Sequence, residues 1–105
     1  MNSRRYLCSH LVSLRKNSGE SAAARVVNLE EIWQTGAVLE SEEPVEEAAR
    51  VEIHCGEAVF AGRIVQVSAH EFGWRLEMEF SPETPWSPDR FRPEHLLELP
   101  APNHP

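Results

Sequence analysis

The chain has 105 residues, of which 41% are hydrophobic and 26% are charged, as is usual for one soluble globular domain. The net charge of −7 argues against a general nucleic-acid binder, because neutralising phosphate groups requires a basic surface. No apolar run approaches the roughly 20 residues that cross a bilayer, and no apolar signal core follows the N-terminus. We therefore expect a cytoplasmic protein without membrane insertion.

The N-terminal residues 1–5 form a basic segment that we expect to be flexible. Arg4 and Arg5 have two interpretations: a solvated terminus, or an anion clamp, because guanidinium groups bind phosphates through paired hydrogen bonds and stack on flat bases. A first strand is predicted at 6–15, because side chains of one face are mostly apolar. This face carries Tyr6, Cys8, His10, Val12 and Leu14.

The next segments, residues 16–49, carry an unusual concentration of negative charge. We predict a turn at 16–21, a strand at 22–29, a loop at 30–35 and a short strand at 37–39. Gly36 is expected to serve a backbone geometry that a side chain would obstruct. Seven glutamates and no Lys or Arg lie between positions 30 and 47. This run is either a solvated face or a docking surface for a basic partner, with Glu40, Glu42, Glu43, Glu46 and Glu47 as the candidate residues.

Residues 51–80 show the clearest pattern in the chain. Apolar and polar residues alternate over 51–55 and 72–80, and 58–69 is rich in Val, Ile and Phe, so we predict three consecutive antiparallel strands. The last run places one apolar row on a single face, namely Phe72, Trp74, Leu76, Met78 and Phe80. Such a face is unstable in water, so the rest of the chain must cover it or close it into a barrel.

The C-terminal part is divided by prolines at 82, 85 and 88, which exclude a helix or a central strand there. A short helix is predicted at 93–99, with Pro93 in its first turn, and a frayed tail at 100–105. Trp33 and Trp86 fall in predicted loops, where an indole either caps a barrel end or offers a platform to a ligand. Five or six strands and a late helix predict one mainly β domain, a small antiparallel barrel with a short C-terminal helix.

Residues with catalytic or metal-binding chemistry lack a recognisable arrangement. Cys8, His10, His54 and Cys55 are zinc-ligand types, but His54 and Cys55 are adjacent in a strand and must point to opposite faces. No local motif frames a nucleophile beside a base. We therefore expect no catalytic residue, no metal and no cofactor, with both cysteines as free thiols.

The order of parts resembles a PilZ domain, the bacterial six-stranded barrel known as a receptor for cyclic di-GMP. Arg4-Arg5-Tyr6 leads into the first strand, Glu31 to Leu39 is similar to a loop of the form Asp/Asn-x-Ser-x-x-Gly followed by an apolar strand, and Gly73 to Phe80 is similar to the last barrel strand. The resemblance covers about residues 4–99 and implies a six-stranded antiparallel barrel for the whole chain.

In PilZ domains an Arg-x-x-x-Arg pair grips the phosphates and guanines, and the Asp/Asn-x-Ser-x-x-Gly loop completes the site. The resemblance therefore implies candidate ligand-binding residues at Arg4, Arg5, Glu31, Trp33 and Gly36. The second arginine is missing, since Cys8 and Ser9 occupy its two candidate positions. Losing one such charge-assisted hydrogen bond costs about 1.5–3 kcal/mol, which is about a tenfold to hundredfold loss of affinity.

The loop of this chain also departs from the family pattern. Glu31 stands in the place of Asp or Asn, and Trp33 in the place of Ser, where an indole would crowd the pocket. The resemblance thus implies a non-enzymatic signalling adaptor that has lost cyclic di-GMP binding and acts through a protein partner. The alternative is a residual nucleotide receptor, in which Arg4, Arg5 and Arg25 grip the ligand and Trp33 stacks on a base.

Overall fold

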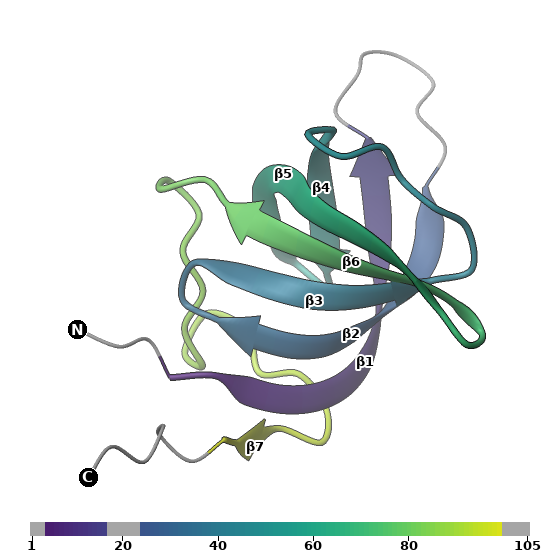
Figure 1. Ribbon diagram of the computed structural model, residues 1–105. Helices are drawn as coiled ribbons and strands as arrows, with labels where there is room; N and C mark the ends of the chain where they lie inside the picture. The colour runs from purple at the N-terminus through teal and green to yellow at the C-terminus, as the bar shows by residue number, and fades with distance from the viewer. Residues whose placement is uncertain (1–3, 17–23, 100–105) are drawn as a thin grey trace, which may run out of the picture.

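The computed structural model describes residues 4–16 and 24–99 and shows a closed, six-stranded antiparallel β-barrel with one short additional strand (Figure 1). The strands are β1 (Tyr6–Lys16), β2 (Arg25–Trp33), β3 (Gly36–Ser41), β4 (Arg50–Cys55), β5 (Ala58–His70), β6 (Gly73–Phe80) and β7 (Leu97–Glu98). Their order around the barrel is β2-β3-β6-β5-β4-β1, and the β1–β2 ladder closes it.

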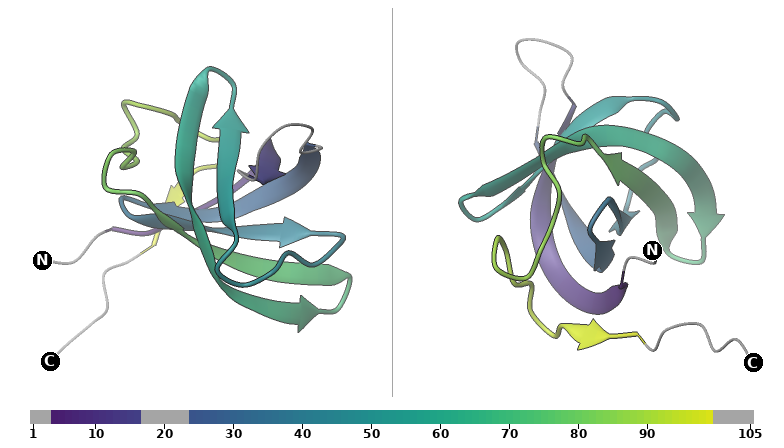
Figure 2. Two further views of the ribbon diagram at one scale, coloured as in Figure 1. Left: turned by 90° about the horizontal axis from the view of Figure 1, so that it is seen from above. Right: turned by 90° about the vertical axis from the view of Figure 1, so that its left-hand side faces the viewer.

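β1 is the strand that closes the barrel. Residues 6–14 pair with β2, the last four residues pair with β4, and Tyr6 and Leu7 pair with β7 on the opposite edge from β2. The two views in Figure 2 show β1 curving around the barrel to reach these partners. A register shift between Leu7 and His10 accompanies this curvature, as β-bulges commonly do.

The interior is filled by alternate residues from all six strands, which confirms the predicted inner rows. In β6, Leu76, Met78 and Phe80 are buried, and Trp74 packs partly buried against them. In β1 the predicted row from Tyr6 to Leu14 faces inward. Phe72 differs from the prediction: it lies in the β5–β6 turn and is 84% exposed, because the hairpin reverses before the alternation reaches it.

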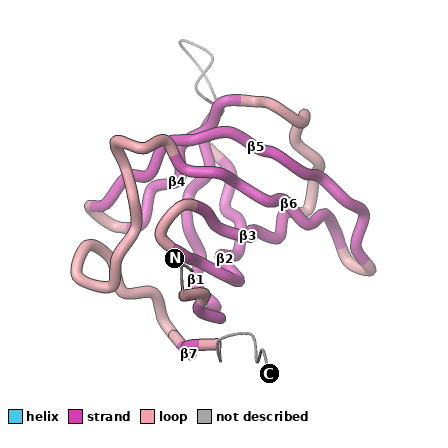
Figure 3. Tube along the Cα trace, turned by 60° about the vertical axis from the view of Figure 1, so that its left-hand side comes forward, coloured by secondary structure: helices cyan, strands magenta, loops and turns pink. Residues whose placement is uncertain are grey.

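Two loops contribute side chains to the barrel interior. Trp86 lies in the proline-rich segment after β6, is 3% exposed and belongs to the core, so it takes the predicted capping role. Its ring packs edge-on against Tyr6 at 5.2 Å, and its Nε1–H donates to the Phe91 carbonyl at 2.8 Å. Val45, from the acidic loop between β3 and β4, is likewise buried in the core. Figure 3 shows the segment after β6 running along the barrel to β7.

Two predicted elements differ in the structure. Residues 93–99 form no helix: Leu97 and Glu98 pair with β1 as β7, and His95 has a positive φ of 59°, which no helix contains. Residues 30–33 belong to β2 rather than to a loop, because a bulge at Glu30 interrupts the alternation without ending the strand.

Within the described residues there is no helix long and apolar enough to span a bilayer. The tail at 100–105, residues 1–3 and most of the turn predicted at 16–21 lie outside the described residues.

Candidate functional site

Trp33 lies on the outer wall of the barrel, at the end of β2. Its neighbour Ile32 belongs to the core, so Trp33 points outward by strand alternation. Gly36, its cross-strand partner in β3, lies beneath the indole. A Cβ atom added to Gly36 would sit 2.5 Å from the Met78 carbonyl oxygen and 2.9 Å from Cζ2 of Trp33. The predicted role of Gly36 as a position that excludes a side chain is therefore confirmed.

The indole of Trp33 is covered rather than open. The Cζ atom of Arg5 lies 4.0 Å from the centre of its ring, which is cation–π geometry. Trp33 is only 7% exposed, although it is not part of the barrel interior. Arg5 and Gly36 together hold this side chain flat on the outer wall.

Glu31 joins the same group and neutralises its positive charge. One carboxylate oxygen of Glu31 lies 3.7 Å from Nη1 of Arg5, and the other lies 3.4 Å from Nη2 of Arg75 in β6. The Glu31 side chain is 16% exposed, so these ion pairs are partly shielded from water. The sequence does not identify Arg75 as a member of this group, because the strand order is needed to place it. Arg75 points outward from β6, which lies next to β3 and one strand away from β2.

The remaining arginines of the proposed clamp lie elsewhere. Arg4 pairs with Glu98 of β7 at 2.6 Å, away from the indole. Arg25 lies at the far end of β2, where it pairs with Glu43 and donates to the Glu43 carbonyl. Ile32, the β2 partner of Tyr6, lies seven positions after Arg25, roughly 23 Å along the strand, so Arg25 and Arg5 lie too far apart to form one clamp.

The structure also distinguishes the two positions considered for a second arginine. Cys8 points into the barrel, where it packs against the core. Ser9 is exposed on the outer face of β1, as Arg5 is. The spacing from Arg5 to Ser9 is therefore the one that matches an outer-wall site, and its second member is a serine.

The acidic residues form a second group, on and after β3. A carboxylate oxygen of Glu40 lies 2.9 Å from Nδ1 of His70. Glu42, Glu43, Glu46 and Glu47 are exposed along the loop that leads to β4. The hydroxyl of Ser41 starts this loop by donating to the Glu43 carbonyl and accepting from the Glu43 N–H.

Glu30 connects the two groups. Its pKa is raised above its usual value, because burial disfavours the charged carboxylate and because Glu40 lies within hydrogen-bonding and coulombic range. Asn28 and Arg75 oppose this shift. Burial and the neighbouring Glu40 therefore disfavour the charged form of Glu30 between β2 and β3.

The zinc-type residues do not converge. Among the described residues, no group of three or more His, Cys, Asp or Glu side chains is placed to hold a metal ion. His10 accepts from the Glu94 N–H through Nδ1, and His54 pairs with Glu52 on the outer face of β4. Both cysteines are free thiols, and burial raises the pKa of each to about 12.

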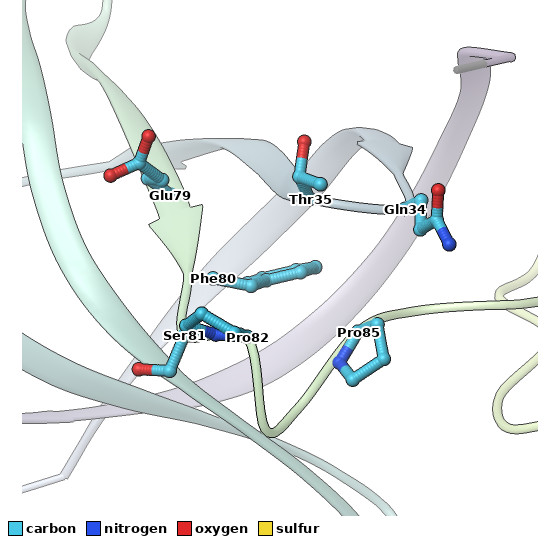
Figure 4. Close-up of a pocket in the computed structure, with 7 residues that line it drawn as sticks. All are labelled: Gln34, Thr35, Glu79, Phe80, Ser81, Pro82 and Pro85. Carbon is cyan, nitrogen blue, oxygen red and sulfur yellow. The ribbon is translucent and has the colours of Figure 1, made fainter. Parts of the chain in front are cut away.

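A pocket of about 580 Å³ lies beside the β2–β3 turn (Figure 4). Figure 4 shows the ring of Phe80 between Thr35 on one side and Pro82 and Pro85 on the other. Glu79 lines this pocket, and its carboxylate would repel a phosphate. It is separate from the group around Trp33.

Comparisons with protein-family models, with curated proteins and with solved structures found no match for this chain.

Proposed function

We propose that the protein is a non-enzymatic adaptor of the PilZ type, which binds a protein partner and has lost cyclic di-GMP binding. The observation that carries the proposal is the closed state of the group around Trp33. The guanidinium of Arg5 stacks on the indole and pairs with Glu31, and Glu31 in turn pairs with Arg75.

A dianionic ligand would meet unfavourable charge at this place. A phosphate that binds Arg5 would compete with Glu31, and the carboxylate of Glu31 would then face the ligand with only Arg75 to balance it. Trp33 offers little surface for stacking, since it is 7% exposed. Ser9, at the outward position of the second arginine, supplies no charge.

Isothermal titration of the purified chain with cyclic di-GMP, at low and at physiological salt, tests this part of the proposal. We expect no saturable heat at either salt concentration. Binding with micromolar or tighter affinity would overturn it and would support the alternative, a residual nucleotide receptor.

One observation favours that alternative. Arg5, Trp33 and Gly36 lie together on one wall of the barrel, as a ligand site would require. In a receptor, Arg5 would swing from the indole to a phosphate, and the uncovered ring would stack on a base, which contributes about 1–3 kcal/mol. Arg5→Ala should then abolish the binding heat, whereas unchanged affinity would exclude this arrangement.

The protein-partner part is tested by co-purification from an extract of the protein's own cells. Glu46→Lys/Glu47→Lys reverses two exposed charges of the acidic loop, and Glu57→Lys/Glu83→Lys reverses two exposed charges elsewhere as a matched control. We expect a stoichiometric partner that the wild type and the control retain and that the loop variant loses. Equal retention by both variants would remove the acidic loop from the proposed interface.

A further inference from the structure

The β5–β6 hairpin extends past the end of β4 and leaves part of β5 at the edge of the sheet. The β4–β5 ladder ends at Arg50 and Arg63, whereas the β5–β6 ladder continues to His70 and Gly73. Figure 1 shows this hairpin projecting from the barrel. Residues 66–70 thus pair with β6 on one side and with no described strand on the other.

The acidic loop covers only the beginning of this edge. Ala48 donates to the Ile64 carbonyl at 2.7 Å, and the Ile64 N–H donates to the Ala49 carbonyl at 3.0 Å. Three residues later, past the register shift between Ile64 and Gln66, the Val67 N–H donates to a side chain, the carboxylate of Glu47, at 3.3 Å. Glu47 therefore occupies the place that a strand carbonyl would take.

The position of the Val67 N–H identifies which backbone groups face the open side. Successive residues of an antiparallel strand direct their N–H and C=O groups to alternate edges. Ala69 therefore directs its N–H and C=O away from β6, next to Val67. Within residues 4–16 and 24–99 no backbone hydrogen bond reaches Ala69 from this side. An unpaired row of this kind is a template for another strand.

We propose that an extended, basic segment of a partner protein adds to this edge of β5 as a further antiparallel or parallel strand, opposite Val67 and Ala69. The proposal rests on the adaptor function and names the chemistry of the partner. Backbone pairing of this kind supplies affinity in many peptide-recognition domains, and side chains supply the choice of peptide.

The charges beside the edge determine that choice. Glu46 and Glu47 are exposed next to it, and Glu42 lies earlier in the same loop. When a peptide carbonyl accepts from Val67, the carboxylate of Glu47 is released to pair with a Lys or Arg of the peptide. An acidic peptide would meet like charge instead. Phe72, 84% exposed at the hairpin tip, offers an apolar contact at the end of the edge.

The test uses the full chain and three fluorescein-labelled hexapeptides in an anisotropy titration at low salt. The probe is Arg-Val-Lys-Val-Arg-Thr. The first control is its acidic counterpart Glu-Val-Asp-Val-Glu-Thr, and the second is the basic peptide with alternate backbone nitrogens methylated. We expect the basic peptide to bind with micromolar affinity and to slow the hydrogen exchange of the Ala69 amide. Both controls should bind at least about tenfold more weakly, because one lacks the charge and the other lacks the backbone donors.

Variants locate the binding on the protein. Ala69→Pro removes the edge N–H and should weaken the basic peptide about tenfold or more, while the fold tolerates it because that N–H faces outward. Glu47→Lys should weaken it as well, and Glu57→Lys, which changes the net charge equally at the β4–β5 turn, should leave it unchanged.

Binding of the methylated peptide as tightly as its parent would mean that charge alone holds it, and would overturn the proposal. Failure of the basic peptide to bind, or unchanged binding by a folded Ala69→Pro variant, would overturn it too. A natural partner retained equally by Ala69→Pro and wild type would exclude this edge and leave the adaptor function standing. If the wild type itself retains no partner in the co-purification experiment, that result would instead count against the adaptor function.

Discussion

Gly36→Ala is the substitution whose consequence the structure defines most closely. The added methyl group would lie 2.5 Å from the Met78 carbonyl oxygen in the neighbouring strand and 2.9 Å from Cζ2 of Trp33. The first contact is with backbone in the β3–β6 ladder, which cannot move without breaking the sheet. The second is with the indole that Arg5 covers. Both contacts must lengthen, so strand spacing and the Trp33 position change together.

The expected loss is in the upper part of the usual range for overpacking. Inserting a methyl group into a closely packed site costs about 1–3 kcal/mol, and the backbone contact places this variant at about 2–3 kcal/mol. In a chain of 105 residues this lowers Tm by roughly 10 °C or more. Gly56→Ala is the matched control: nothing lies within 4 Å of its added methyl, and only its φ of 65° is unfavourable, at about 1 kcal/mol.

Urea unfolding followed by circular dichroism measures the free energy of unfolding, and a double-mutant cycle with Trp33→Phe identifies the cause. Phenylalanine lacks the outer indole atoms that the new methyl group meets, so Gly36→Ala should be less destabilising in that background by about 0.5 kcal/mol or more. If Gly36→Ala lies within about 0.5 kcal/mol of wild type, or if the two changes are additive, the described packing of Trp33 on Gly36 is wrong.

Three further predictions follow from burial and charge. Burial raises the pKa of Cys8 and Cys55 to about 12, so the thiolate fraction at pH 8 is about a thousandfold below that of an ordinary thiol. Iodoacetamide should therefore label both residues only after the protein unfolds. Labelling of the native protein at the rate of the unfolded protein would contradict this prediction. Because the pKa of Glu30 is raised in the folded state, its contribution to the free energy of unfolding is fully present below the ordinary pKa of 4.5 and is lost as pH rises through the folded-state pKa. Glu30→Gln should therefore stabilise the protein more at pH 7 than at pH 4, as measured by urea unfolding. An equal effect at both pH values would refute this prediction. Trp86→Phe leaves the Phe91 carbonyl without its 2.8 Å donor and should lower the free energy of unfolding by about 1–3 kcal/mol, whereas no change would mean that water replaces the indole N–H.

The central part of the fold follows from the sequence because its determinants are local. In β4 and β6 every second residue is apolar, and the turns between β4, β5 and β6 contain only two residues each, so pairing and register are set together. The closure by β1 is also predictable in outline, since a one-sided apolar meander needs a cover. The inward row of β1 is confirmed from Tyr6 to Leu14.

The errors lie where distant partners determine the conformation. Pro93-Glu-His-Leu-Leu-Glu-Leu has a helical composition, yet Leu97 pairs with Leu7, ninety positions earlier, and the backbone follows that pairing. The bulge at Glu30 shifts the alternation of β2, so a continuous strand reads as a strand followed by a loop. The Arg5–Trp33 contact depends on both, because it needs the β1–β2 register beyond the bulge.

Trp33, which departs from the loop pattern of PilZ domains, has a structural consequence in this chain. Where the resemblance places a small hydroxyl, Trp33 supplies a large apolar surface, and the outer wall beside it buries Val38 completely although Val38 is not part of the barrel interior. The barrel wall is therefore packed on both faces here, with Arg5 and Glu31 as its polar cover. Release of Arg5 would expose the indole to water, which disfavours any rearrangement that removes this cover. Trp33 and its polar cover thus stabilise this part of the barrel wall, and under the proposed function the partner binds elsewhere, at the acidic loop and the open edge of β5.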